Sequence, residues 1–123
     1  MEGIKKLNQV HKILDFHVTN NPDNVSVLVD SVSYTNTDIF SKVLSLVGFL
    51  KKNKVTPGDR IAYLAKNSSE FIELMYASSI LGLVMVPINF RLAYEEVKFI
   101  IQDSGSKIII FGEEFKELVE KLN

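Results

Sequence analysis

The sequence of 123 residues has no cysteine, few glycines and prolines, and no excess of charge of either sign. Without cysteine, the chain forms no disulfide framework and supplies no thiol nucleophile or thiolate metal ligand. The chain has fourteen Lys and Arg residues and fifteen Asp and Glu residues, which gives a net charge of -1. This balance argues against nucleic-acid binding driven by bulk charge.

The sequence also lacks an apolar run long enough to span a membrane. The longest uncharged segment, Leu74 to Phe90, has 17 residues and contains Gly82 and Pro87, whereas a spanning helix needs about 20 apolar residues. We interpret this segment as a buried helix followed by a buried strand. Residues 1–8 carry two lysines with no apolar stretch behind them, so we expect no signal peptide and a cytoplasmic protein.

What the sequence has is the composition of one globular domain, with 46% hydrophobic and 24% charged residues. Its apolar spacing predicts helices over 4–18, from Thr35 or Thr37 through Leu50, and over 68–81, 94–103 and 113–122. The same reading predicts a hairpin of strands 25–29 and 32–34, and buried strands over 61–65, 83–88 and 108–111. Strands that are apolar on both faces and separated by helices predict an α/β fold. We expect a parallel, mixed-edge sheet with helices on both faces.

Three residues mark expected helix ends. Asn67 precedes a helix and has Glu70 three residues later, which is a capping-box spacing. Gly82 and Gly105 stand where a left-handed residue is expected to end a helix.

No spacing of reactive residues defines a catalytic or metal site. Successive glycines lie 45, 10, 24, 23 and 7 residues apart. Phosphate-binding loops need glycines only about two to five positions apart. His11 and His17 point to different faces of one predicted helix, so they cannot share a metal as an i, i+4 pair can. Ser104-Gly105-Ser106 ends a helix and lacks the preceding glycine of a nucleophile elbow. Glu95-Glu96 and Glu113-Glu114 stand in first helical turns, where negative charge is favourable.

Five stretches, taken in order, resemble motifs of the N-terminal part of the adenylate-forming, AMP-binding enzymes. That superfamily includes the acyl-CoA synthetases, the adenylation domains of peptide synthetases and firefly luciferase. The stretches are Thr35-Asn36-Thr37-Asp38-Ile39, Val55-Thr56-Pro57-Gly58-Asp59-Arg60-Ile61, Asn67-Ser68-Ser69-Glu70-Phe71, Leu81-Gly82-Leu83-Val84-Met85-Val86-Pro87-Ile88-Asn89-Phe90-Arg91-Leu92 and Asp103-Ser104-Gly105-Ser106-Lys107. Each motif is weak alone, but their order and spacing over roughly residues 10–111 are typical of the family. Asn89 makes the fourth stretch more similar to an acyl-CoA synthetase than to a peptide-synthetase domain, which usually has Asp there.

The chain departs from the family pattern at two places. Asn36 stands where the opening motif usually has an aromatic residue, so we expect a packing contact to be missing there. Ala93 and Tyr94 replace the usual Thr-Pro, which removes a helix N-cap worth about 1 kcal/mol. We expect neither change to affect a residue that takes part in the reaction.

The resemblance implies the N-terminal portion of a long- or medium-chain fatty-acid–CoA ligase. Such an enzyme uses ATP, Mg²⁺ and CoA to convert a carboxylic acid into an acyl-adenylate and then into an acyl-CoA. The family's phosphate-binding loop, acyl pocket and catalytic lysine would lie beyond Asn123. We therefore expect residues 1–123 to be inactive alone, to bind none of these cofactors tightly and to contain no catalytic residue or metal ligand.

Other interpretations stay open. The parent protein can be another adenylate-forming enzyme, such as an aryl-CoA ligase or a peptide-synthetase adenylation domain. Alternatively, the chain is a free-standing, non-catalytic α/β binding or interaction module. In the ligase interpretation, other subdomains would cover this one, so we expect the isolated chain to expose apolar surface and to self-associate.

Arg91 is the one cofactor-binding residue that the resemblance implies. In some CoA ligases of the superfamily, the arginine of this motif lies at the phosphates of the CoA nucleotide. Arginine suits that task because its planar fork donates two hydrogen bonds to phosphate oxygens and stays charged. The structural alternative is a surface pair with Glu95 at helical spacing.

Overall fold

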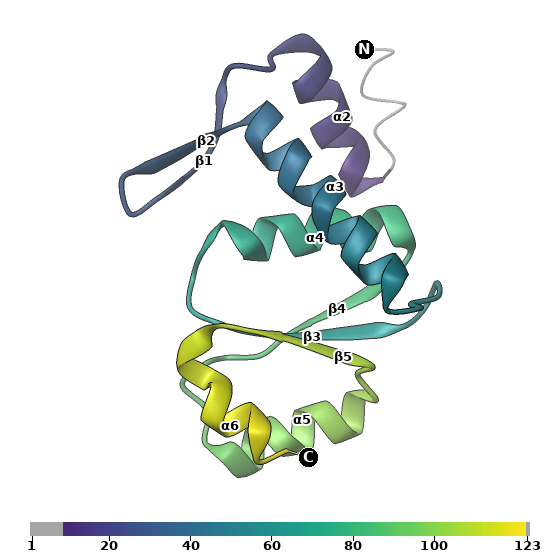
Figure 1. The fold of residues 1–123 in the computed structure, drawn as a ribbon, viewed down its shortest axis with the longest axis vertical. Coiled ribbons are helices and arrows are strands. Elements are labelled where there is room, and N and C mark those ends of the chain that lie inside the picture. Colours follow the sequence, from purple (N-terminus) through teal and green to yellow (C-terminus); the bar gives the residue numbers. More distant parts are fainter. Residues whose placement is uncertain (1–8, 123) are drawn as a thin grey trace.

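A three-stranded parallel sheet lies at the centre of the computed structural model, which describes residues 9–122 (Figure 1). Its strands are β3 (Arg60–Leu64), β4 (Val84–Pro87) and β5 (Ile108–Phe111), in the spatial order β4-β3-β5. Ile61 of β3 pairs in parallel register with Met85 of β4 and with Ile108 of β5. The predicted parallel sheet is confirmed.

Helices cover both faces of this sheet (Figure 1). On one face lie α3 (Asn36–Lys52) and α4 (Ser69–Leu81), and α2 (Val10–Asn20) packs on these two helices. The other face carries α5 (Tyr94–Ser104), the 3₁₀ turn η1 (Glu113–Phe115) and α6 (Lys116–Glu120). Side chains alternate along a strand, so Ile61 and Tyr63 of β3 join the core beneath α3 and α4, whereas Ala62 and Leu64 pack with Val97 of α5. The α/β fold class is therefore confirmed.

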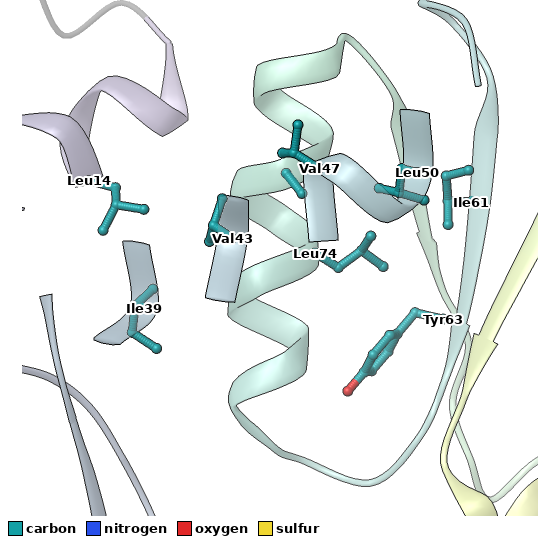
Figure 2. Packing of buried hydrophobic residues seen from close by; sticks show 9 residues of the cluster. Leu14, Ile39, Val43, Val47, Leu50, Ile61, Tyr63 and Leu74 are labelled. Carbon is teal, nitrogen blue, oxygen red and sulfur yellow. The ribbon is translucent and has the colours of Figure 1, made fainter. Parts of the chain in front are cut away.

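The larger core is built around the apolar stripe of α3. Ile39, Val43 and Leu50 of this helix are fully buried, at the three- and four-residue spacing that turns one helical face inward. Figure 2 shows this stripe meeting Leu74 of α4 and Ile61 of β3. Each such side chain stabilises the fold by about 1.5–3 kcal/mol when removed from water.

The hairpin consists of β1 (Val25–Val29) and β2 (Val32–Thr35), paired antiparallel. Asp30 and Ser31 connect them with positive φ angles of 47° and 66°, as a tight turn between right-twisted strands requires. The hairpin is a separate two-stranded sheet. The central sheet is therefore parallel at every pairing that the structure describes, without the mixed edge expected from the sequence.

Thr35 and Asn36 join the hairpin to α3. The Thr35 hydroxyl accepts a hydrogen bond from the Asp38 amide at 3.1 Å, and the Asp38 carboxylate accepts one from the Thr35 amide at 2.9 Å. Thr35, rather than Thr37, is thus the N-cap. Asn36 is buried, and its side-chain amide donates to the Asn21 carbonyl at 2.8 Å. In place of the aromatic contact of the family motif, the residue holds the turn after α2 against α3.

Two helix ends differ from the prediction. Asn67 is not the N-cap of α4; Ser68 occupies that position with extended backbone angles. The Ser68 hydroxyl makes no capping bond and is instead hydrogen-bonded to the Tyr63 hydroxyl at 3.0 Å. The last predicted helix is interrupted, since the Phe115 amide donates to the Gly112 carbonyl and forms the 3₁₀ turn before α6. Residues 4–8 of the first predicted helix lie outside the described residues.

The Pro-Gly-Asp turn before β3 packs against the end of α4. The Gly58 amide donates to the Gly82 carbonyl at 2.7 Å. Gly82 has φ 70°, and a Cβ added there would lie 3.4 Å from the Pro57 Cβ, so this left-handed helix end also permits a close approach. The carboxylate of Asp59 accepts hydrogen bonds from the Thr56 amide at 2.8 Å and from Lys107 at 3.1 Å. The motif thereby links the amino ends of β3, β4 and β5.

Large apolar side chains remain exposed on several elements. Leu28 of the hairpin is 67% exposed and Phe99 of α5 is 65% exposed. Self-association of the isolated chain, which such side chains favour, stays a prediction. Among the helices of residues 9–122, none has the length and apolarity needed to cross a membrane.

We predict that Ala93→Thr stabilises the protein. Ala93 is an exposed N-cap with φ -73° and ψ 160°, and its side chain makes no capping bond to α5. A threonine hydroxyl at this position can accept a bond from the first turn, which should raise the free energy of unfolding by about 0.5–1 kcal/mol in urea titrations. Ala93→Val is the matched control, because it has the same shape without the hydroxyl. Equal stability of the two variants would contradict capping.

We also predict that Asp59→Asn lowers stability in a pH-dependent way. The hydrogen bond from the Thr56 amide, followed by that from Lys107, lowers the pKa of Asp59 from its ordinary value of 3.8. A lowered pKa stabilises the fold above the unfolded-state value, and the stabilisation disappears as the pH falls through the folded-state pKa. The urea midpoint of the variant should therefore be lower at neutral pH and approach that of the wild type below pH 3.8. The control is Asp23→Asn, in an exposed turn. If this variant showed the same pH-dependent loss in urea midpoint, the effect would not come from the hydrogen bonds of Asp59.

Candidate functional site

Two crevices open at the carboxyl ends of the parallel strands, where ligands of α/β sheets usually bind. The larger has a volume of about 510 Å³ and lies beyond β3 and β4. Its lining consists of Tyr63, Ala65, Lys66, Asn67, Phe71, Pro87, Ile88, Asn89, Phe90 and Arg91. Cavities of this size accommodate small-molecule ligands.

The smaller crevice, of about 290 Å³, lies beyond β3 and β5. It shares Tyr63, Ala65, Lys66 and Asn67 with the larger crevice and adds Ser68, Glu70, Ile110, Phe111, Gly112 and Glu114. The connection from β3 to β4 runs through α4 on one face, and that from β4 to β5 runs through α5 on the other (Figure 1). After β3 the chain enters α4 on one face, whereas after β5 it enters η1 and α6 on the opposite face. Neighbouring strands that lead to opposite faces are typical of a topological switch point.

The loop after β4 places Arg91 at the larger crevice. The Ile88 amide donates to the Tyr63 carbonyl at 2.8 Å, so the parallel pairing continues one residue beyond β4. The Asn89 side-chain oxygen then accepts a hydrogen bond from the Arg91 amide at 3.0 Å. This local turn, which asparagine favours, uses the family-like Asn89 to fix the backbone that carries Arg91.

The Arg91 guanidinium is exposed and lies over the Phe90 ring, 4.7 Å from its centroid. Such a contact is worth about 0.5–1 kcal/mol at an exposed site and orders the side chain without neutralising it. The sequence also allowed a surface ion pair between Arg91 and Glu95. The ion pair that the structure records among residues 9–122 joins Lys107 to Asp59 instead. The geometry leaves the hydrogen-bonding edge of Arg91 available to a ligand.

Tyr63 stands between the two crevices and is buried. Burial is the main cause that raises the pKa of its hydroxyl above the ordinary value of 10.0, so the group is neutral near pH 7. The Ser68 side chain hydrogen-bonds Glu70 and lowers the pKa of that carboxylate, which keeps Glu70 charged. The smaller crevice is therefore acidic on its Glu70 side.

The other candidate residues of the sequence are structural. The His11 ring bonds the Ser79 hydroxyl at 2.8 Å and so ties α2 to α4, whereas His17 makes an edge contact with Phe16. The hydroxyls of Ser104 and Ser106 bond each other at 2.7 Å at the end of α5. Within the described part of the chain, no three His, Asp or Glu side chains gather in a way that holds a metal ion.

The sequence analysis singled out Arg91, and the structure places it in a crevice with Lys66, Tyr63 and Phe71, which the sequence analysis did not single out. Lys66 and Arg91 are 25 positions apart, and no local motif joins them. The signal in the sequence that could have linked Lys66 to Arg91 is that each follows a buried strand. The carboxyl ends of neighbouring parallel strands meet at one edge of a sheet, so residues after such strands converge.

Comparison with known proteins shows the family. Residues 14–123 match the model of the AMP-binding enzyme family, and the chain belongs to it. It is 35% identical over 107 residues to the fatty acid–[acyl-carrier-protein] ligase ScoC of Streptomyces coeruleorubidus, covering 87% of this chain and 21% of that protein. It is 51% identical over 70 residues to the long-chain-fatty-acid–CoA ligase FadD13 of Mycobacterium tuberculosis, covering 57% and 13%.

The fold is similar to that of a solved relative as well. A fatty acyl CoA synthetase of Mycobacterium tuberculosis superposes with a TM-score of 0.87 at 34% identity, over 94% of this chain and 24% of that one. The chain thus spans about a fifth of the length of the relatives that it matches. The family motifs quoted from the sequence lie in the region that these proteins share.

Proposed function

We propose that this chain is the N-terminal part of an AMP-forming acid–CoA ligase, truncated before the phosphate-binding loop. The observation that carries the proposal is Arg91, a charged and exposed side chain at the carboxyl ends of β3 and β4 in a chain of this family. The reaction would have two steps. A carboxylate attacks the α-phosphate of ATP to give acyl-adenylate and pyrophosphate, and the CoA sulfur then displaces AMP to give acyl-CoA.

Residues 9–122 do not fit the role of an ATP and Mg²⁺ site. The described glycines lie at turns, helix ends or open positions, and no three His, Asp or Glu side chains of these residues gather as metal ligands. We assign both binding roles to other parts of the parent protein. Within the described part of the chain, the larger crevice has two cations and no carboxylate in its lining, which fits an anionic co-substrate.

We propose a fatty acid as the substrate and CoA as the acyl acceptor. Fatty-acid ligases among the relatives support the substrate class. The acceptor is open to a second candidate, because one relative transfers to an acyl-carrier protein and another to CoA. Arg91 favours CoA, since a guanidinium binds phosphate through two parallel hydrogen bonds.

Pyrophosphate exchange tests the proposed ligase. We expect the full-length protein encoded with this sequence to exchange labelled pyrophosphate into ATP when a fatty acid is present. The 123-residue chain should remain at background, because it has no phosphate-binding loop. Two results would contradict the proposal. One is exchange activity that co-purifies with the short chain, and the other is a full-length protein without exchange activity for any carboxylic acid.

Replacement of Arg91 tests its role in the second step. In the full-length ligase, Arg91→Ala should raise the KM for CoA roughly 10- to 100-fold, because one charge-assisted phosphate contact contributes on the order of 1.5–3 kcal/mol. Acyl-adenylate formation should change much less, since that step does not use CoA. Stopped-time assays of each half-reaction measure both effects.

The matched control is Arg60→Ala, the other arginine of the chain. Arg60 begins β3, at the opposite end of the sheet from the crevice, and donates to the Ser104 carbonyl at 2.7 Å. Its replacement should leave the dependence on CoA unchanged. Equal losses in both half-reactions of the Arg91 variant would show a structural role for that residue instead.

A further inference from the structure

A third crevice lies away from the central sheet, where α2, the hairpin, α3 and α4 meet (Figure 1). It has a volume of about 410 Å³, and none of its lining residues lines either crevice at the carboxyl ends of the strands. We call it the hairpin crevice. A space of this size is large enough for a small-molecule ligand.

Asn36 of α3 presents a fixed hydrogen-bond acceptor to the hairpin crevice. The residue is 7% exposed, its backbone amide donates to the Asn24 carbonyl at 2.9 Å, and its side-chain amide donates to the Asn21 carbonyl at 2.8 Å. Because the amide nitrogen must face that carbonyl, the side-chain oxygen Oδ1 is the group left over. No donor to Oδ1 is recorded among residues 9–122, and Oδ1 is not one of their buried unpartnered atoms. Oδ1 therefore keeps access to the crevice that Asn36 lines.

Tyr76 of α4 contributes an uncommitted hydroxyl to the same crevice. Burial raises the pKa of this hydroxyl above the ordinary value of 10.0, so the group keeps its proton near pH 7 and can donate it in a hydrogen bond. The hydrogen bonds recorded within the described part of the chain do not involve this hydroxyl. The Tyr76 ring, together with Ile13 of α2 and Val25 of β1, adds apolar surface to the lining.

The lining of the hairpin crevice contains no Lys, Arg, Asp or Glu side chain. A charged ligand would lose hydration there without meeting an opposite charge, so the crevice favours an uncharged ligand. Such a ligand needs a donor for Asn36 Oδ1 and an acceptor for the Tyr76 hydroxyl. A carboxamide carries both groups on one planar unit.

The space next to Asn36 also suits a ring. Asn36 stands where the opening motif usually has an aromatic residue, and a side chain of that size would take up part of the hairpin crevice. Spaces left by a missing side chain can take up a small aromatic molecule. We propose that the hairpin crevice binds an uncharged aromatic carboxamide, whose N–H donates to Asn36 Oδ1 and whose carbonyl accepts from Tyr76. This site goes beyond the proposed ligase, because it shares no residue with the crevice of Arg91.

Two ligands of nearly the same shape test the role of Asn36. Benzamide and acetophenone both have a ring and a carbonyl, but only benzamide has an N–H donor. In NMR titrations of the full-length protein, benzamide should bind with a Kd of about 1 mM, which is reasonable for so small a ligand. Acetophenone should bind about three- to tenfold more weakly, the effect of one hydrogen bond. Benzoate, which is charged and has no donor, should bind more weakly than benzamide as well.

Three variants locate the binding site. Asn36→Leu should remove the preference for benzamide over acetophenone, because it removes Oδ1. Tyr76→Phe should weaken both ligands about three- to tenfold, since both carbonyls lose the same donor. Tyr34→Phe is the matched control: Tyr34 is another half-buried tyrosine, outside the hairpin crevice, and its replacement should leave both affinities unchanged.

The outcomes decide the proposal without reference to ligase activity, because each is a binding measurement. A wild type that binds neither ligand, or binds both equally, overturns the carboxamide site. Affinities that Tyr76→Phe leaves unchanged, or a benzamide preference that persists in Asn36→Leu, also overturn it. If Asn36→Leu does not fold, the wild-type preference and the comparison of Tyr76→Phe with Tyr34→Phe decide alone.

Discussion

The burial of β3 on both faces and along both edges is the constraint on which the rest of this structure depends. Ile61, Ala62 and Leu64 have no exposed surface, and Tyr63 is 3% exposed. A strand enclosed in this way must be apolar throughout, and its backbone groups must pair with neighbours on both sides, which β4 and β5 provide. The two helical layers follow from this burial, because apolar side chains project from both faces of residues 61–64 and each face must be shielded from water.

The same strand decides where chemistry can occur. Its amino end is closed by the Pro-Gly-Asp turn, in which Asp59 joins Thr56 and Lys107. Its carboxyl end is left open, because the chain departs there into α4 while the neighbouring strands lead into η1 and the loop of Arg91. Polar side chains from different loops therefore collect at one end of the sheet, and the paired strands behind them bring those loops together.

Much of the fold was predictable because its determinants are local. Apolar runs located β3, β4 and β5, and Gly82 and Gly105 ended their helices with φ angles of 70° and 64°. Asn67 was expected as a cap, but α4 begins one residue later with Ser68 at the N-cap, whose hydroxyl bonds Tyr63 in a contact that depends on tertiary structure. The candidate site was only partly predictable for the same reason. Arg91 belongs to a recognisable motif, whereas Lys66 reaches the same crevice only through the convergence of two strands.

The outer strands of the central sheet have a consequence for how this unit can be built into a larger protein. Within the described residues, β4 and β5 pair only with β3, so each presents one row of backbone amides and carbonyls without a strand partner. Such rows accept an additional strand readily. Either side of the sheet can therefore be extended without rearranging β3, and the unit is a nucleus from which a wider sheet can grow in two directions.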